Sequence, residues 1–183
     1  MSLTKTPICD FGKQAENFKL KSTDGKFLKL EDLKGKNGTL IMFICNHCPY
    51  VKAIISDVVK DCNVLSKLGV NSVAICSNDV VNYPEDSFEN MGIFSKKNKF
   101  NFSYLHDETQ EVAKKYGAVC TPDFFGYNGN LELQYRGRIR ELKDLKPIRD
   151  GDSDLLLAMR EISKTGNGPK KQIPSMGCNI KWK

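Results

Sequence analysis

The stretch TLIMFICNHCPYVKAIISDVVKDCNVLSKLGVNSVAIC, residues 39–76, decides the fold class. It opens on an almost wholly apolar run, residues 39–44, typical of a strand that is buried on both faces of a parallel sheet. Residues 51–68 then repeat apolar side chains at three- and four-residue steps, which predicts a helix, and Gly69 is placed to end it. A second apolar run, residues 70–76, predicts another strand. Together they predict a βαβ unit with parallel strands.

The flanking segments extend this unit into one domain. Apolar and polar residues alternate over residues 18–30 around Asp24-Gly25, which predicts an N-terminal β-hairpin. We predict further helices over residues 84–99, 107–116 and 152–164, strands over 102–105, 123–127 and 131–136, and a polar turn over 31–36. This order predicts an α/β fold with a central mixed β-sheet flanked by helices. We expect a domain at residues 1–164 and a C-terminal tail at residues 165–183.

Length, composition and charge exclude several classes of protein. The chain has 183 residues, 40% of them hydrophobic and 27% charged, which excludes collagen, coiled coil and wholesale disorder. The apolar runs are far shorter than the about 20 residues of a membrane-spanning helix. The net charge is +6, and the lysines are scattered among acids with only five arginines, which favours a solvated surface. We therefore expect neither a nucleic-acid partner nor a membrane partner.

The cysteine count bears on the compartment. An odd number of cysteines cannot be fully paired within one chain. Because no secretory signal is visible in the first residues, we expect a cytoplasmic protein, where cysteines are buried, catalytic or metal-binding. We expect Cys62 and Cys76 in the core because they fall on the apolar patterns. The seven cysteines are Cys9, Cys45, Cys48, Cys62, Cys76, Cys120 and Cys178.

The segment Cys45-Asn46-His47-Cys48-Pro49 joins a predicted strand to a predicted helix, and sites in α/β sheets form at such strand ends. Proline is favoured at the first position of a helix, so Cys48 is predicted to be the N-cap residue. A sulfur there faces unpaired backbone N–H groups and the positive end of the helix dipole, which favours the thiolate. His47 could assist if it is protonated. The sequence therefore predicts a nucleophilic Cys48.

Four motifs resemble the thioredoxin-fold redoxins, the superfamily of thioredoxins and peroxiredoxins. They are KLEDLKGKNGTLIMFICNHCPYVKAI at residues 29–54, VAICSND at 73–79, AVCTPDFF at 118–125 and SMGCNIKWK at 175–183. The sequence is most similar to a bacterial peroxiredoxin-like branch, related to alkyl hydroperoxide reductase and thiol-specific antioxidant proteins, that carries NHCPYV, CTPDFF and the terminal motif. The resemblance runs from about residue 11 to the end. It implies a thioredoxin-like fold and a thiol-dependent antioxidant oxidoreductase.

The resemblance also implies roles for single residues. Cys48 takes the position of the attacking cysteine, with His47 and Pro49 beside it as substrate-positioning residues. Thr121 and Pro122 match the cis-proline loop, which faces the nucleophile and aligns the substrate by pairing with an extended peptide. A second thiol would resolve the oxidised Cys48, and the candidates are Cys45, Cys120 and, on the tail, Cys178.

Some positions depart from the family pattern. The second cysteine of thioredoxins, three residues after the attacking one, is Val51 here. The peroxide-binding threonine of peroxiredoxins, three residues before it, is Cys45. The acid that assists thioredoxins would lie in residues 39–44, which contain none. The motifs therefore indicate the fold and the branch, and leave the reaction open.

The leading hypothesis is an oxidoreductase whose Cys48 thiolate reduces a disulfide or a peroxide through a mixed-disulfide or sulfenic intermediate. An unknown thiol reductant restores it, no cofactor or metal is expected, and the oligomeric state stays open. The alternative is a thioredoxin-fold protein that binds copper or zinc through Cys45, His47 and Cys48. A third is a binding module that kept the fold and lost the chemistry. The tail would either cover the site or hang free.

Overall fold

The computed structural model describes residues 3–7 and 10–183, so Cys9 lies outside the described residues. The strands are β1 (Leu3–Lys5), β2 (Lys19–Ser22), β3 (Phe27–Lys29), β4 (Gly38–Phe43), β5 (Val70–Cys76), β6 (Ser103–His106), β7 (Cys120–Thr121), β8 (Asp123–Tyr127), β9 (Leu133–Arg136), β10 (Leu142–Lys143), β11 (Lys146–Pro147) and β12 (Met176–Asn179). The helices are α1 (Leu30–Leu33), α2 (Pro49–Ser66), the 3-10 helix η1 (Pro84–Asp86), α3 (Phe88–Lys97), α4 (Glu111–Tyr116) and α5 (Asp154–Thr165).

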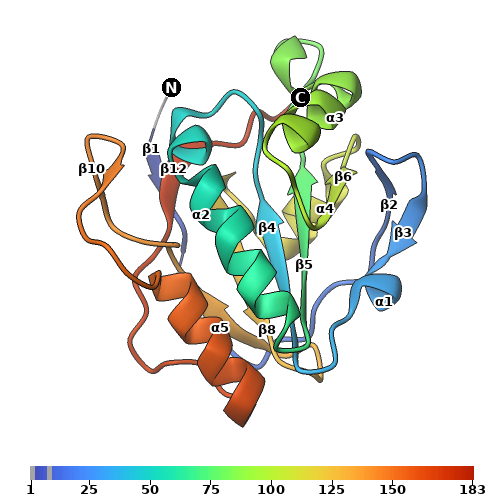
Figure 1. Ribbon diagram of the computed structural model, residues 1–183. Helices are drawn as coiled ribbons and strands as arrows, with labels where there is room; N and C mark the ends of the chain where they lie inside the picture. The colour runs from blue at the N-terminus through green and yellow to red at the C-terminus, as the bar shows by residue number, and fades with distance from the viewer. Residues whose placement is uncertain (1–2, 8–9) are drawn as a thin grey trace.

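A seven-stranded sheet in the order β3-β2-β6-β5-β4-β8-β9 forms the centre of the molecule (Figure 1). β4 and β6 run parallel to β5, whereas β8 runs antiparallel to β4. Every residue of β4 is buried, because the strand is central and both faces of the sheet are covered. This confirms the predicted mixed sheet, the βαβ unit and the N-terminal hairpin, which is β2 paired with β3.

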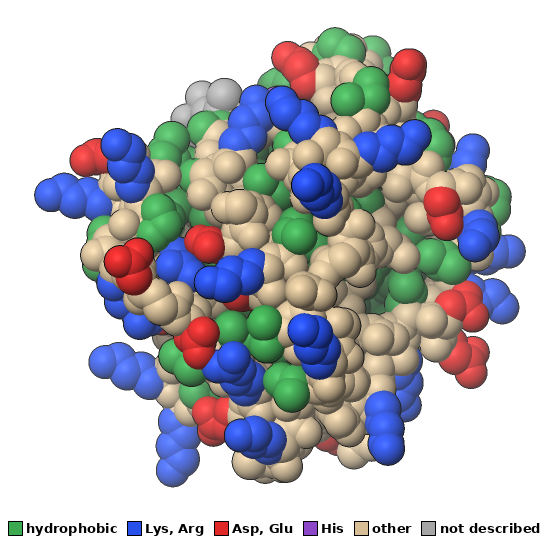
Figure 2. All heavy atoms as spheres, in the orientation of Figure 1, with side chains coloured by type: hydrophobic (Ala, Val, Ile, Leu, Met, Phe, Trp, Pro, Cys, Tyr) green, Lys and Arg blue, Asp and Glu red, His purple; other side chains and the backbone are tan. Residues whose placement is uncertain are grey.

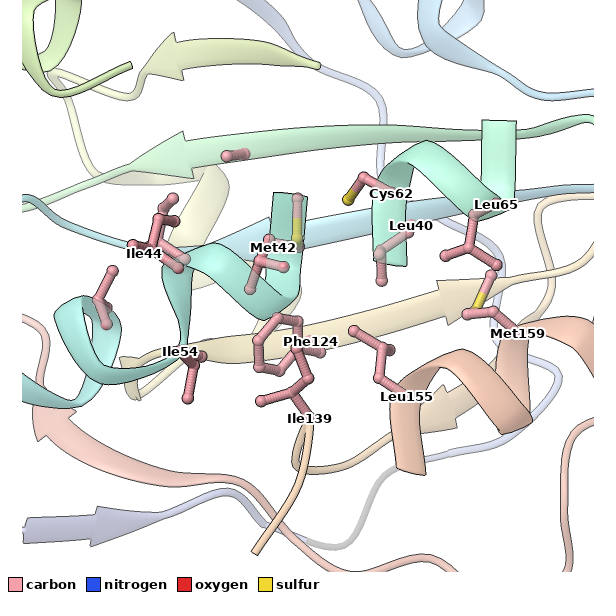
Figure 3. Close-up of a cluster of buried hydrophobic side chains, with 14 of the residues drawn as sticks. Leu40, Met42, Ile44, Ile54, Cys62, Leu65, Phe124, Ile139, Leu155 and Met159 are labelled. Atoms are coloured by element: carbon pink, nitrogen blue, oxygen red, sulfur yellow. The ribbon is translucent and has the colours of Figure 1, made fainter. Parts of the chain in front are cut away.

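Helices cover both faces of the sheet. Figure 3 shows one face, where side chains from β4, α2, β8 and α5 interdigitate; among them are Leu40, Met42, Ile54, Phe124, Leu155 and Met159. The other face packs against α1 and α4, with Phe43 of β4 next to Tyr116 of α4. Each large apolar side chain buried in this way contributes about 1.5–3 kcal/mol to the free energy of unfolding. The two layers hold the end of β4 and the start of α2 in place.

α2 forms because its apolar positions share one face. Its buried residues include Val51, Ile54, Val58, Cys62 and Leu65, as the periodicity predicts. The helix begins at Pro49 with Cys48 as its N-cap and ends at Ser66, and the turn that follows it closes on Gly69, whose φ of +74° suits a glycine.

Three local predictions are wrong. Residues 31–36 are not a plain turn, because α1 takes their first half. The helix predicted over 84–99 is divided into η1 and α3 by Ser87, whose side chain accepts from Asn90 N–H as an N-cap. The helix predicted from residue 107 begins at 111, and the buried Asp107 carboxylate accepts the N–H groups of Val112 and Ala113.

The segment after α5 does not hang free. β12 inserts between β1 and β7 in a three-stranded sheet, and Figure 1 shows it beside β1 and the first turns of α2. Ile180 is buried in the core on the α4 side of the sheet. Trp182, the single tryptophan of the chain, follows with Lys114 Nζ 5.7 Å from its ring centroid. This segment is therefore not a loose tail. The domain boundary at residue 165 stays a prediction.

Charged side chains are spread over the visible face in Figure 2, with acids among the lysines and arginines. Among the described residues, no helix is both long enough and apolar enough to cross a membrane. Binding to nucleic acid is not tested by these observations, and its absence stays a prediction.

Candidate active site

Three segments that are distant in sequence meet at the start of α2. Cys48 Sγ lies 3.3 Å from the carbonyl oxygen of Thr121, and Cys45 Sγ lies 3.3 Å from Thr121 Oγ1. Cys178 stands directly opposite Thr121 in the pairing of β12 with β7. The Thr121–Pro122 peptide bond is cis, as the resemblance implies. The structure thus brings the predicted nucleophile, the proline loop and two of its three candidate partner thiols together.

The surroundings of Cys48 favour its ionised form. A hydrogen bond from the Cys45 thiol is the largest cause that lowers the pKa of Cys48, and burial opposes it. The backbone N–H of Val51, in the first turn of α2, and the thiol and N–H of Cys178 lower it further. The pKa of Cys48 falls to about 5, so the sulfur is a thiolate near neutral pH.

The hydrogen bonds of this site depend on which thiol carries a proton. When Cys48 is protonated, its S–H donates to the carbonyl oxygen of Thr121. When Cys48 is ionised, it can only accept, and the S–H groups of Cys45 and Cys178 then point their protons at it. The Thr121 hydroxyl can donate to Cys45 at the same time, which gives a chain from Thr121 through Cys45 to Cys48.

Cys45 stays protonated as a consequence. The hydrogen bond that it gives to Cys48 raises the pKa of Cys45 well above its ordinary value, and burial adds to the rise. Cys45 is therefore a hydrogen-bond donor in this site.

The third candidate thiol, Cys120, lies on the other side of the strand. Directly opposed residues of paired strands share a face and successive residues alternate, so Thr121 and Cys178 share one face while Cys120 and Asn179 share the other. The Cys120 thiol donates to the carbonyl oxygen of Pro122 at 3.7 Å, and burial raises its pKa far above its ordinary value. Cys120 is thus the one candidate that the geometry does not bring to Cys48.

His47 is tied to a carboxylate that the sequence did not reveal. Its Nδ1 lies 2.7 Å from Oδ2 of Asp86 in η1, and the Asp86 side chain is fully buried. Oδ1 of Asp86 also accepts the N–H of Asn46 at 2.7 Å. The hydrogen bond with Asp86 raises the pKa of His47, although burial opposes it. Burial alone would raise the pKa of Asp86, but hydrogen bonds from His47 and Asn78 bring it below its ordinary value.

This buried carboxylate lies in η1, outside the strand in which the family pattern would place an acid. Residues 84–86 carry no motif, and the contact bridges about 40 positions of sequence to Asn46, so only the fold shows it. The ring of Tyr83 stacks on the ring of His47, with the two centroids 5.7 Å apart. Lys181 Nζ in turn lies 5.6 Å from the centroid of the Tyr83 ring. The end of the chain thereby touches the surroundings of His47.

The candidate metal ligands are not the set that the sequence predicted. Ligand atoms of Cys45, His47 and Asp86 all lie within 4.8 Å of one another, so Asp86 takes the place expected for Cys48. Both oxygens of Asp86 already accept hydrogen bonds, from Asn46, His47 and Asn78. A cation here would compete with these hydrogen bonds for the Asp86 oxygens.

Cys48 is closed off from solvent. Its exposed fraction is 0%, and that of Cys178 is 3%. A cavity of about 530 Å³ lies next to this cluster, and its walls include Tyr50 at the start of α2, Pro122 and Met176. Access to the sulfur therefore requires movement of the segments that cover it, of which β12 is one.

Comparisons with known proteins identify the family and the fold. The model of the AhpC/TSA family matches residues 11–142. A solved structure of an uncharacterized conserved protein from Geobacillus kaustophilus is 43% identical, covers 100% of this chain and 97% of its own, and superposes with a TM-score of 0.95. A hypothetical protein from Sinorhizobium meliloti 1021 is 36% identical, with 98% of each chain covered and a TM-score of 0.91.

More distant structures share the fold. The thioredoxin domain of a thiol-disulfide oxidoreductase from Bacteroides vulgatus is 16% identical, covers 70% of this chain and 89% of its own, and has a TM-score of 0.60. A search among curated proteins found no match. With the matched family model, the α/β architecture and the cysteine at the start of α2 in agreement, the chain belongs to the AhpC/TSA family and is a peroxiredoxin-like, thioredoxin-fold oxidoreductase.

Proposed function

We propose that the Cys48 thiolate reduces a peroxide or a disulfide and that a second cysteine of the chain then resolves it. The observation that carries this proposal is the placement of Cys48 Sγ at the N-terminus of α2, 3.3 Å from Thr121 O, among thiols that lower its pKa to about 5. A thiolate is the form of cysteine that attacks sulfur and oxygen.

The chemistry balances for both substrates. With a peroxide, Cys48 sulfur attacks one oxygen, the O–O bond breaks, and the second oxygen leaves as an alcohol or water after taking a proton, so that Cys48 becomes a sulfenic acid. With a disulfide, Cys48 forms a mixed disulfide and one thiolate leaves. In either case a second thiol forms a disulfide with Cys48, and an outside thiol supplies the two electrons that restore both.

His47 supports these steps through its charge. The carboxylate of Asp86 holds Nδ1 at 2.7 Å and raises the pKa of His47, so the ring carries its proton over a wider pH range. A positive charge next in the chain to Cys48 favours departure of an anionic leaving group. Pro49, Thr121 and Pro122 fix the approach to the sulfur.

The test combines a titration with an activity measurement. The ultraviolet absorbance of the thiolate should show a step near pH 5 that Cys48→Ser removes. Consumption of hydrogen peroxide or of a small disulfide, with dithiothreitol as reductant, should be lost in Cys48→Ser and retained in Cys62→Ser, the matched control in the core. Which substrate is consumed decides the reaction class. Retained activity in Cys48→Ser would contradict the proposal.

Metal binding is the second candidate, and the grouping of Cys45, His47 and Asp86 is the observation that favours it. Copper(I) prefers the sulfur and nitrogen of such a site, and zinc accepts all three ligand types. Titration with zinc or copper(I) should then show one equivalent bound, with loss of binding in both Cys45→Ser and Asp86→Asn. Binding that survives both substitutions would exclude this site.

A cytoplasmic location is part of the proposal. The six described cysteines are all thiols, which suits a compartment that keeps thiols reduced. Fractionation of cells that express the chain would test it, and recovery in a secreted fraction would overturn it.

A further inference from the structure

The strand β12 closes the candidate active site. It enters between β1 and β7 and stands antiparallel to β7, so that Cys178 lies opposite Thr121. The carbonyl oxygen of Thr121 is the group that Cys48 Sγ approaches to 3.3 Å. Cys178 is therefore held on the same face of β7 as the nucleophile, and the two thiols form a side-chain hydrogen bond.

The close approach of β12 depends on Gly177. A Cβ atom at this position would lie 2.1 Å from Thr121 O and 3.0 Å from Pro122 Cδ, so no side chain fits there without displacing the strand. The glycine thus lets the backbone next to Cys178 pack directly on the proline loop.

Anchors on both sides of β12 fix the register. Ser175 Oγ donates to the carbonyl oxygen of Pro122 at 2.7 Å on one side. On the other side, Ile180 N–H donates to Val119 O at 3.1 Å and Lys181 N–H donates to Asn78 Oδ1 at 2.9 Å. With both ends held, a slip of the strand by one residue would turn Cys178 away from Cys48.

The other two thiols are less suited to resolve Cys48. Cys120 faces away from it on β7. Cys45 keeps its proton, donates its S–H to the Cys48 thiolate and accepts a hydrogen bond from the Thr121 hydroxyl in the ionised site. Burial raises the pKa of Cys178 to about 11, and the nearby charge of Lys181 limits the rise. Both Cys45 and Cys178 donate to the Cys48 thiolate, and of these two it is Cys178 that β12 holds opposite Thr121.

We propose, resting on the proposed function, that Cys178 is the resolving thiol and that β12 delivers it to Cys48 within the same chain. The Cys178 sulfur attacks the Cys48 sulfenic acid, the S–O bond breaks, and water leaves with the proton of Cys178. In the disulfide reaction Cys178 attacks the Cys48 sulfur of the mixed disulfide, and the substrate leaves as a thiol. Two electrons from an outside thiol later reduce the Cys48–Cys178 disulfide.

The test maps the disulfide that forms. The reduced full chain is treated with one equivalent of hydrogen peroxide or of a small disulfide, quenched by acid and alkylation, and digested with trypsin. Cys178 lies on peptide 172–181, Cys120 on 116–136, and both Cys45 and Cys48 on 37–52. The experiment is therefore repeated in Cys45→Ser to identify the partner. We expect peptide 37–52 linked to 172–181 in a protein that stays a monomer on a non-reducing gel.

Single substitutions separate the two proposals. In Cys178→Ser, Cys48 should stop at the sulfenic acid and be trapped by dimedone, while Cys120→Ser should form the same disulfide as the unchanged chain. An oxidised Cys48 that is linked to Cys45, to Cys120 or to a second chain would overturn the role of Cys178 and leave the proposed function standing. No oxidation of Cys48 with either oxidant, even in Gly177→Ala, would overturn the proposed function itself.

A second variant tests delivery by the strand without removing a cysteine. In Gly177→Ala the new Cβ pushes β12 off Thr121, so disulfide formation should slow, and alkylation of reduced Cys48 by iodoacetamide should speed up, each by about tenfold. The matched control is Gly92→Ala in α3, where a Cβ meets nothing within 4 Å and both rates should be unchanged. Unchanged rates in Gly177→Ala would overturn the role of β12.

Discussion

At the scale of the residue, the ionised form of Cys48 depends on the hydrogen bonds that its neighbours donate to the sulfur. Thr121 and Cys45 form a chain of hydrogen bonds that ends on Cys48, and Cys178 approaches it from β12. A hydrogen bond to the charged form is worth more in a buried site than in water, because competing solvent is absent. The low pKa of Cys48 therefore depends on the cluster as a whole.

Replacement of Cys45 by alanine tests this dependence. Cys45→Ala removes the largest cause that lowers the pKa of Cys48, so that pKa should rise from about 5 by about 1–2 units. Titration of the thiolate absorbance measures it. Cys62→Ala is the control, because Cys62 is buried along α2 and is not among the groups that shift Cys48. A titration curve of Cys45→Ala that overlays the unchanged chain would show that Cys45 has no such role.

Sequence alone identified part of the site at this scale. The proline after Cys48 predicts its place at the start of a helix, and the resemblance to the redoxins predicts the Thr121-Pro122 loop. The role of Asp86 was not predictable, because no residue near it in sequence indicates its contact with His47. The sequence does not separate Cys120 from Cys178, because only the pairing of β12 with β7 shows which face of β7 each one shares.

At the scale of the element, α2 and α5 share a buried carboxylate that is not part of the Cys48 cluster. Asp61 of α2 accepts a hydrogen bond from Ser153, the N-cap of α5, at 2.5 Å. Burial raises the pKa of Asp61 to about 6, and the bond from Ser153 offsets only part of the rise. The folded chain thus holds a proton on Asp61 at pH values where the unfolded chain has released it.

The sign of the pH dependence follows. Because the folded pKa of Asp61 lies above its unfolded value of 3.8, the contribution of this group to stability is present at low pH and is lost as pH rises toward about 6. Asp61→Asn keeps an acceptor for Ser153 and carries no charge. We expect its free energy of unfolding in urea at about pH 8 to exceed that of the unchanged chain by about 1–3 kcal/mol.

The control for this prediction is Asp144→Asn in the exposed hairpin of β10 and β11. It should change the free energy of unfolding by less than about 0.5 kcal/mol. A gain for Asp61→Asn that persists unchanged below about pH 4 would show that the effect does not come from ionisation of Asp61.

Elements with strong periodicity were the ones that sequence predicted well. The apolar patterns of α2 and β5 are clear in the sequence, and the same residues are buried in the folded chain. The break between η1 and α3 was not predicted. Ser87 is an N-cap because its side chain accepts a hydrogen bond from Asn90 N–H, and the sequence does not show that contact. β12 was not predicted because Gly177 and Cys178 carry no pattern that is typical of a strand. The strand forms because it can pair with β7 next to the proline loop.

At the scale of the whole molecule, a Cys48–Cys178 disulfide would join the start of α2 to the end of the chain. Such a link closes a loop of roughly 130 residues, and it would raise the free energy of unfolding by roughly 3–5 kcal/mol through the reduced entropy of the unfolded chain. The oxidised protein should therefore unfold at a higher urea concentration than the reduced protein. Equal midpoints for the two forms would contradict this expectation, and Cys178→Ser should show no difference between them.

The end of the chain also carries an optical consequence. The single tryptophan, Trp182, lies three residues beyond the last residue of β12, with its ring beneath Lys114. Tryptophan fluorescence therefore comes from one place only, next to the strand β12 that carries Cys178. Stopped-flow measurement of that emission after mixing with an oxidant would time the undocking and return of the strand without any attached dye.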